Sequence, residues 1–196
     1  MNKILVFLFN GMTDYEITFI THLLSADAGK EVITISYEDN TIKSRAGFLY
    51  KSHQLVKEVL HEDVEALILC GGWYGELRNE LVELIHNLNL SNKLLAAICG
   101  AGTVFLAKAG VLDHVNYTTP AMEWTEQHIK IFGECNPFPR DNFIDKRVVR
   151  DRNVITAKGE AFIDFAIEVC DWFNLFDSRE EKENFGRRYG NVYAGL

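Results

Sequence analysis

Continuous apolar runs alternate along the chain with segments whose apolar residues recur at helical spacing. Residues 4–9 (ILVFLF), 64–70 (VEALILC) and 94–98 (LLAAI) are nearly all apolar, as expected of strands buried on both faces of a sheet. Residues 13–28 and 76–88 place apolar side chains three or four positions apart, which predicts amphipathic helices. This alternation predicts an α/β fold of flavodoxin-like type, a mostly parallel sheet with helices on both faces.

The remaining segments complete this pattern. Further elements are predicted as strands at 31–37, 147–150 and 153–157, a small hairpin at 42–51, and helices at 103–109 and 161–176. Residues 113–140 cannot be assigned, because three prolines interrupt them. The charged segment 178–196 has three interpretations: a short helix, an arm on a partner subunit, or disordered chain. No repeat or linker is visible, so we expect one domain over residues 1–196.

Composition narrows the classes of function. The net charge of −8 and the lack of a basic block argue against binding to nucleic acid. No apolar segment approaches the roughly 18 residues of a membrane span. The four cysteines, at positions 70, 99, 135 and 170, form no C-x-x-C pair, and the histidines show no metal-binding spacing. We therefore expect no metal and no cofactor, and a reducing cytoplasm with free thiols as the setting.

Cys99 stands where a strand-type run ends and a helical run begins. Gly100, Ala101 and Gly102 follow it, and small neighbours suit a nucleophile on a strained strand-to-helix turn, the nucleophile elbow. The free N–H groups and positive dipole end of the next helix would favour thiolate over thiol. A small buried hydrophobic residue is the alternative, because unpaired cysteines are among the most buried residues. Spacing alone leaves these two interpretations even.

Two glycines follow the neighbouring strand. Gly71 and Gly72 allow close approach of a ligand, and their N–H groups, together with that of Gly100, suit an oxyanion site. An ordinary strand-ending turn is the alternative, and spacing alone favours it. Trp73 and Tyr74 come next and are interpreted either as the wall of a substrate pocket or as a cover for the sheet end.

Glu16 also has two interpretations. Thr13-x-x-Glu16 fits a capping box, in which the glutamate bonds back to the N–H of the cap residue. Alternatively, the carboxyl lies beside the Cys99 sulfur and, when protonated, donates a hydrogen bond to the thiolate. Spacing alone favours the cap.

The chain offers no evident base for Cys99. A cysteine hydrolase usually needs a histidine within hydrogen-bond reach of the sulfur, but Gly100 is the next residue. His114 is the nearest histidine downstream, in the loop after the elbow helix, and His128 lies further along near Trp124. Surface positions explain both histidines better than a Cys–His pair does.

Three motifs together resemble a known family. Asn10-Gly11-x-x-Asp14-x-Glu16, Leu69-Cys70-Gly71-Gly72 and Ala96-Ala97-Ile98-Cys99-Gly100-Ala101-Gly102 look like the ThiJ/PfpI superfamily, including its peptidase-like, intracellular protease branch. Its members share the class I glutamine-amidotransferase-like fold. The resemblance runs from residue 4 to about residue 176.

The resemblance implies a flavodoxin-like sandwich that is usually dimeric. It also implies a cysteine of low pKa at Cys99, a carboxylate partner at Glu16, and oxyanion N–H groups from Gly72 and Gly100. On this basis a contact between Glu16 and Cys99 becomes the preferred interpretation, and capping can hold beside it.

The sequence departs from the family where a histidine is expected. Peptidase-like members carry histidine directly after the cysteine, where this chain has Gly100. Other members place a histidine before a proline further on, where this chain has Thr119-Pro120. Residues 151–160 contain no histidine for an amidotransferase His-Glu pair. A Cys–His hydrolytic mechanism is therefore not supported.

Two functions of different classes follow. The first is a cysteine-dependent, hydrolase-like enzyme acting on a reactive carbonyl or on an amide or peptide bond, with Cys99 as nucleophile and Glu16 as proton partner. Its substrate pocket would include Trp73, Tyr74, Thr119 and His114. The second is a non-catalytic redox sensor or stress-response protein with an oxidisable Cys99. A weaker third option is a ligand-binding protein with an aromatic pocket that also includes Trp124. The expected partners are a small-molecule or peptide substrate and a second copy of the chain, without nucleic acid or membrane.

Overall fold

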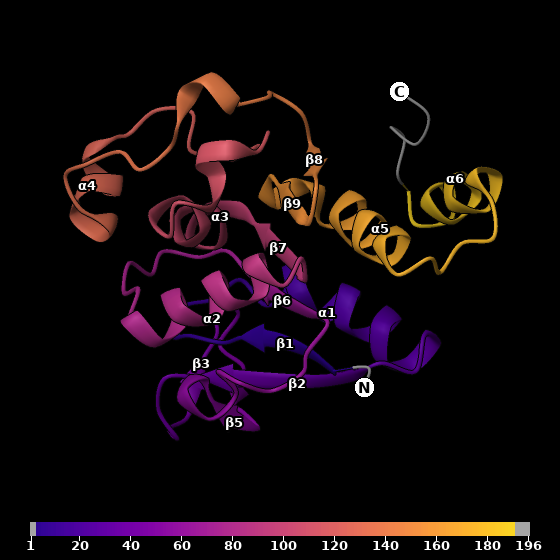
Figure 1. Ribbon diagram of the computed structural model, residues 1–196, viewed down its shortest axis with the longest axis horizontal. Coiled ribbons are helices and arrows are strands. Elements are labelled where there is room, and N and C mark those ends of the chain that lie inside the picture. Colours follow the sequence, from indigo (N-terminus) through magenta and orange to yellow (C-terminus); the bar gives the residue numbers. More distant parts are fainter. Residues whose placement is uncertain (1–2, 191–196) are drawn as a thin grey trace.

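The sheet at the centre of the molecule has a strand order that differs from the order along the chain. The computed structural model describes residues 3–190, and its seven-stranded sheet has the order β5-β2-β1-β6-β7-β9-β8 (Figure 1). All neighbouring strands are parallel except the last pair, β9 and β8. The strands are β1 (Lys3–Phe7), β2 (Glu31–Ser36), β5 (Gln54–Leu55), β6 (Ala66–Leu69), β7 (Leu94–Ile98), β8 (Val148–Asp151) and β9 (Val154–Ala157). A separate hairpin consists of β3 (Ile42–Lys43) and β4 (Leu49–Tyr50).

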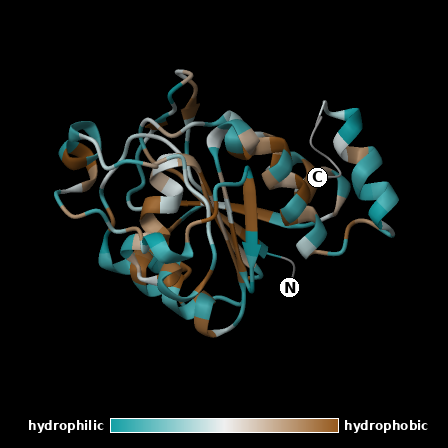
Figure 2. Ribbon diagram, turned by 90° about the horizontal axis from the view of Figure 1, so that it is seen from above, coloured by the Kyte–Doolittle hydropathy of each residue, from teal (hydrophilic) through white to brown (hydrophobic). Residues whose placement is uncertain are grey.

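Helices cover both faces of the sheet. On one face α1 (Tyr15–His22) packs against α5 (Phe162–Trp172), and on the other α2 (Asn79–Leu90) and α3 (Cys99–Lys108) lie over β6 and β7 (Figure 1). A π-helical turn over residues 23–27 continues α1. The short helix α4 (Glu126–Phe132) lies beyond α3, while α6 (Arg179–Arg188) packs on α5 and is mostly hydrophilic (Figure 2). Short 3-10 turns cover residues 56–58, 111–114, 140–142 and 159–161.

Apolar strands form the core, as the continuous apolar runs predict. Every residue of β6 and β7 is buried, and these strands form part of a hydrophobic centre enclosed by helices with polar outer faces (Figure 2). Gly102 lets α3 approach the end of β6, because a Cβ there would lie 3.1 Å from the carbonyl oxygen of Cys70 and closer still to that of Leu69. The glycine and alanine residues around Cys99 therefore bring α3 close to the sheet.

The predicted fold class is confirmed, and three details differ from the sequence-based assignment. The elbow helix begins at Cys99 itself rather than at residue 103. The two-residue strand β5 was not predicted, and α4 lies within the unassigned segment 113–140. In the tail, residues 179–188 form a short helix, one of the three interpretations. Residues 191–196, the rest of the segment 178–196 for which a partner arm is another interpretation, lie outside the described residues.

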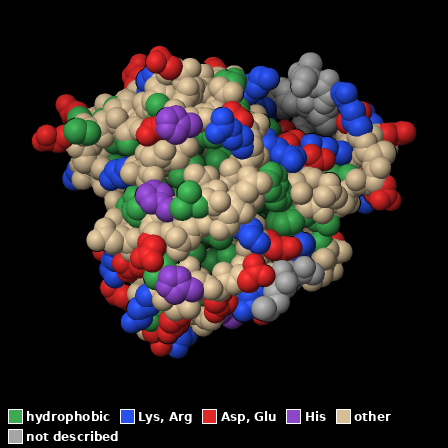
Figure 3. Space-filling model, viewed as in Figure 1, with side chains coloured by type: hydrophobic (Ala, Val, Ile, Leu, Met, Phe, Trp, Pro, Cys, Tyr) green, Lys and Arg blue, Asp and Glu red, His purple; other side chains and the backbone are tan. Residues whose placement is uncertain are grey.

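The surface agrees with the charge pattern of the sequence. On the face seen in Figure 3, acidic and basic side chains are interspersed, without a continuous basic patch. Within residues 3–190, none of the helices combines the length and the apolar character needed to cross a bilayer.

Candidate active site

Cys99 occupies a strained backbone position at the end of β7. Ile98 is still extended, with φ −127° and ψ 144°, whereas Cys99 has φ 64° and opens α3. A non-glycine residue in this left-handed region is uncommon and costs on the order of 1–2 kcal/mol. The turn places the cysteine at the carboxyl edge of the sheet and at the amino end of a helix, which is the geometry predicted for a nucleophile elbow.

Glu16 reaches the same edge from the first turn of α1. Its side chain is only 1% exposed, and Oε2 accepts a hydrogen bond of 2.7 Å from the N–H of Gly71. No N–H or O–H group of the described residues donates to the other oxygen, Oε1. The capping-box interpretation is wrong. Asp14 is the N-cap of α1, and the N–H of Thr13 donates to the carbonyl of Gly71, because the end of β6 supplies the partners.

Two glycines let the carboxyl and the thiol come together. A Cβ on Gly71 would lie 2.6 Å from Glu16 Oε2 and 2.7 Å from Cys99 Sγ. A Cβ on Gly159 would lie 3.0 Å from both Cys99 Sγ and Glu16 Oε1. The four residues therefore pack as one group, and Glu16 and Cys99 are neighbours as the family resemblance implies.

Burial and charge decide where protons reside in this pair. Burial raises the pKa of Glu16 to about 7, although the N–H of Gly71 and the Cys99 thiol act as hydrogen-bond donors and lower it. Burial, followed by the charge of Glu16, raises the pKa of the Cys99 thiol to about 12, while the N–H groups of Gly100 and Gly72 lower it. The expected low pKa of Cys99 is therefore not what the structure gives when Glu16 is ionised. A thiolate is favoured only when Glu16 holds the proton, so the two groups act as a unit that shares a proton.

The N–H groups of Gly72 and Gly100 face the sulfur from two different elements. Gly72 has φ +138°, a conformation that side chains rarely adopt, and its carbonyl accepts the N–H of Ala101 at 3.2 Å. This bond ties the loop after β6 to the start of α3. Both N–H groups stabilise negative charge at the sulfur, so the arrangement is suited to an oxyanion as well.

Tyr15, which the sequence analysis missed, precedes Glu16 at the start of α1 and interacts electrostatically with Glu16 and Cys99. It is 50% exposed, and its ring packs edge-on against Phe162 at 5.3 Å. Its pKa is raised mainly by burial, and further by the negative charges of Glu16, Cys99 and Glu160. Its position next to Glu16 in the sequence was the available signal.

Trp73 and Tyr74 diverge after Gly72. Trp73 is 40% exposed and contacts His128 and Phe132 of α4, with ring centroids 5.2 and 5.9 Å away. Tyr74 stacks on Phe9 at 4.8 Å and lines a separate cavity of about 220 Å³ with Tyr37 and Arg78. Trp73 therefore lies against α4, and Tyr74 turns to a neighbouring cavity.

The two other pocket candidates are not exposed at the elbow. Thr119 is fully buried, and its hydroxyl lies 2.9 Å from that of Thr103 in α3. His114 ends the 3-10 turn that follows α3, so the ten-residue helix separates it from Cys99. A helix of this length spans about 15 Å. The structure does not bring His114 to the sulfur.

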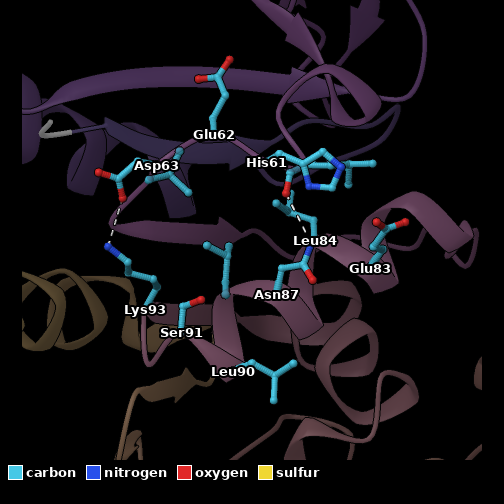
Figure 4. Close-up of a pocket in the computed structure, with 12 residues that line it drawn as sticks. His61, Glu62, Asp63, Glu83, Leu84, Asn87, Leu90, Ser91 and Lys93 are labelled. Atoms are coloured by element: carbon cyan, nitrogen blue, oxygen red, sulfur yellow. Dashed lines mark hydrogen bonds and ion pairs between the residues drawn. The ribbon is translucent and has the colours of Figure 1, made fainter.

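A larger pocket lies at the opposite edge of the sheet. It has a volume of about 490 Å³ and is bounded by α2 and the segment before β6 (Figure 4). An ion pair between Lys93 and Asp63, at 3.3 Å, spans part of it, and Asn87 bonds to the carbonyl of Leu60 (Figure 4). Because these residues lie before β6 and β7 rather than after them, this pocket is separate from the elbow.

Comparison with curated proteins and solved structures gives consistent results. The chain is 27% identical over 195 residues to a Bacillus subtilis protein named uncharacterized protease YdeA, covering 97% of this chain and 93% of that protein. It is 28% identical over 144 residues to the deglycase PfpI of Pyrococcus furiosus, covering 67% and 86% of the two chains.

Among solved structures, the DJ-1 superfamily protein Atu0886 from Agrobacterium tumefaciens superposes with a TM-score of 0.79 at 24% identity, covering 96% of this chain and all of that one. A thiJ/pfpI family protein from Bacillus anthracis gives a TM-score of 0.77 at 27% identity, covering 96% and 91%. The sequence model of the DJ-1/PfpI family matches residues 2–171, which include Cys99, Glu16 and the Gly71-Gly72 pair. The ThiJ/PfpI resemblance is thereby confirmed, and this chain belongs to the DJ-1/PfpI family.

Proposed function

We propose that the protein is a cysteine-dependent enzyme that acts on a small electrophilic carbonyl compound or an amide-like bond. Cys99 is the nucleophile and Glu16 the group that takes and returns its proton. The observation that carries the proposal is the contact between a cysteine held at φ 64° and a buried carboxyl whose pKa is about 7. Such a carboxyl is close to half-ionised at neutral pH, the condition under which a general base and acid works best.

The first step moves one proton and forms one bond. The Cys99 thiol gives its proton to the Glu16 carboxylate as the sulfur attacks the substrate carbonyl carbon, and the carbonyl π electrons move to oxygen. The N–H groups of Gly72 and Gly100 stabilise that oxyanion. Glu16 then returns the proton. With an α-oxoaldehyde such as phenylglyoxal the oxygen receives it and a hemithioacetal forms. Glu16 then moves the proton of the hemithioacetal carbon to the adjacent carbonyl carbon through an enediol, and water hydrolyses the resulting 2-hydroxy thioester to a 2-hydroxy acid and the free Cys99 thiol. With an amide the leaving nitrogen receives the proton as the C–N bond breaks, and water hydrolyses the resulting thioester to a carboxylic acid and the thiol.

The names of the relatives support both substrate classes. The Bacillus subtilis relative is named a protease and the Pyrococcus furiosus relative a deglycase. We favour the small carbonyl substrate, because a cysteine hydrolase usually relies on a histidine to protonate the leaving nitrogen, and His114, the nearest histidine downstream, is not brought to the sulfur.

Parallel turnover assays test the proposal. Phenylglyoxal represents the reactive carbonyl, and a short acyl p-nitroanilide represents the amide. We expect wild-type protein to turn over phenylglyoxal and Cys99→Ser to lose at least a hundredfold in rate. Cys135→Ser is the matched control, because Cys135 is an exposed free cysteine. Full activity in Cys99→Ser would show that the nucleophile is assigned wrongly.

The unpartnered Oε1 of Glu16 favours a second candidate function. A sulfenic or sulfinic acid on Cys99 would place an oxygen near this carboxyl, and a protonated Glu16 could donate to it. We propose oxidation sensing as the alternative. Peptide mass spectrometry after mild peroxide treatment tests it. Oxidation of Cys99 before the exposed Cys135, together with no turnover of either substrate, would support oxidation sensing.

A further inference from the structure

Two buried threonines connect the segment after α3 to the backbone at Cys99. The hydroxyl of Thr103 donates to the carbonyl of Cys99 at 2.6 Å and lies 3.2 Å from the carbonyl of Gly100. The Oγ1 atoms of Thr103 and Thr119 are 2.9 Å apart. Thr119 Oγ1 also accepts the N–H of Ala121 at 3.2 Å. Both threonine side chains are fully buried.

The donor and acceptor of each of these hydrogen bonds follow from the chemistry of the groups. A threonine hydroxyl has a single proton, and a carbonyl oxygen only accepts. The proton of Thr103 is directed to the Cys99 carbonyl at the shorter distance, so Thr119 is the donor between the two hydroxyls. The bonds run in one direction: from the N–H of Ala121 to Thr119, from Thr119 to Thr103, and from Thr103 to the Cys99 carbonyl. Aligned hydrogen bonds of this kind polarise one another.

This row of hydrogen bonds ends on the peptide unit whose N–H faces the sulfur. The carbonyl of Cys99 and the N–H of Gly100 belong to one planar peptide unit, so a bond that orients the carbonyl also orients the N–H. Withdrawing electron density toward the carbonyl oxygen makes the N–H a stronger donor. That N–H lowers the pKa of the Cys99 thiol.

We propose that Thr119 and Thr103 are positioning residues: their hydroxyl relay orients and polarises the Cys99–Gly100 peptide and so strengthens the Gly100 N–H that faces the sulfur. The inference rests on the proposed role of Cys99 as nucleophile. It gives Thr119 a role behind the elbow, in place of a role in contacting substrate.

Matched variants separate the relay from a general loss of stability. Thr119→Val keeps the shape and removes the hydroxyl, while Thr119→Ser keeps the hydroxyl. Thr118→Val is the control, because the hydroxyl of Thr118 is equally buried but donates to the carbonyl of Lys146, at 2.7 Å, outside the relay. Two readouts are followed: the amide proton shift of Gly100 by NMR, and the pH midpoint of Cys99 alkylation by iodoacetamide. Peptide mass spectrometry separates Cys99 from Cys135.

We expect Thr119→Val to move the Gly100 amide proton upfield and to raise the alkylation midpoint by about half a pH unit. Thr119→Ser should restore both values, and Thr118→Val should change neither while lowering the melting temperature. The titratable groups that act on Cys99 or respond to it are Glu16 and Tyr15 of α1 and Cys70 at the end of β6, and all remain in these variants.

Three results would overturn the relay. They are an unchanged Gly100 amide in Thr119→Val, an amide that moves without any change in the alkylation midpoint, and an equal response to Thr118→Val. A wild-type Cys99 that resists alkylation would count against the proposed function instead, and the Gly100 amide would still decide whether the relay exists.

Discussion

The Glu16 carboxyl and the Cys99 thiol face one another between Gly71 and Gly159, in a space that a Cβ on either glycine would crowd. Burial favours the uncharged carboxyl, and the N–H groups of Gly72 and Gly100 favour charge on the sulfur. With pKa values of about 7 for Glu16 and about 12 for Cys99, the pair holds one proton over the pH range between these values and is arranged to move it between oxygen and sulfur.

Burial of Glu16 makes stability depend on pH. Its pKa is raised from 4.5 to about 7 in the folded protein, so the folded state holds the proton more tightly than the unfolded chain does. Stability contributed by Glu16 is therefore present below pH 4.5, is lost as the pH rises toward 7, and stays lost above it. Glu16→Gln cannot titrate. We expect its free energy of unfolding, relative to wild type, to rise by up to about 3 kcal/mol between pH 4.5 and pH 8.

Urea denaturation of both proteins at several pH values measures this difference. A constant difference across the range would mean that Glu16 titrates normally in the folded state.

The same substitution should separate thiol ionisation from turnover. The negative charge of Glu16 raises the pKa of Cys99, so Glu16→Gln should move the high-pH limb of Cys99 alkylation to lower pH. Turnover should nevertheless fall by at least tenfold, because an amide cannot accept the thiol proton. Alkylation of Cys135 in the same sample provides the internal reference. An upward shift of the Cys99 limb would show that the carboxyl supports the thiolate rather than opposing it.

Gly71 tests how closely the site is packed. Gly71→Ala would place a Cβ 2.6 Å from Glu16 Oε2 and 2.7 Å from Cys99 Sγ, so one side chain must move. We expect a loss of about 1–3 kcal/mol in the free energy of unfolding, together with slower Cys99 alkylation. Gly100→Ala is the matched control, because its Cβ meets only the carbonyl of Gly72, at 3.3 Å. Equal tolerance of alanine at both positions in urea denaturation would contradict this packing.

Local patterns predicted the strands better than they predicted the site. The run 94–98 is recognisable because a strand buried on both faces leaves contiguous apolar residues. The contact of Glu16 with Cys99 depends on β1, β6 and β7 being adjacent, which spacing along the chain does not encode. For the same reason the capping box was wrong: the neighbouring strand end supplied a nearer partner for Glu16.

The position of Gly159 in the sequence is a signal that could have placed this residue at the site. Gly159 follows the apolar run of β9, a strand that pairs with β7, so it marks a further strand end at the sheet edge that carries Gly71, Gly72 and Cys99. The relay through Thr103 and Thr119 had no such signal, because it depends on the packing of residues 119–121 against α3.

The strained backbone of Cys99 gives the last prediction. At φ 64° any residue with a Cβ pays a conformational penalty that glycine avoids. Cys99→Gly should therefore be more stable than Cys99→Ala by about 1 kcal/mol, although at ordinary helix positions glycine is less favourable than alanine. Ala101→Gly, two residues into the same helix and without positive φ, should lose about 1 kcal/mol and thus change in the opposite direction. Urea denaturation of the three variants and the wild type measures both signs. If Cys99→Gly were less stable than Cys99→Ala, the elbow would not be strained, and a relaxed turn would have to explain how the sulfur reaches Glu16.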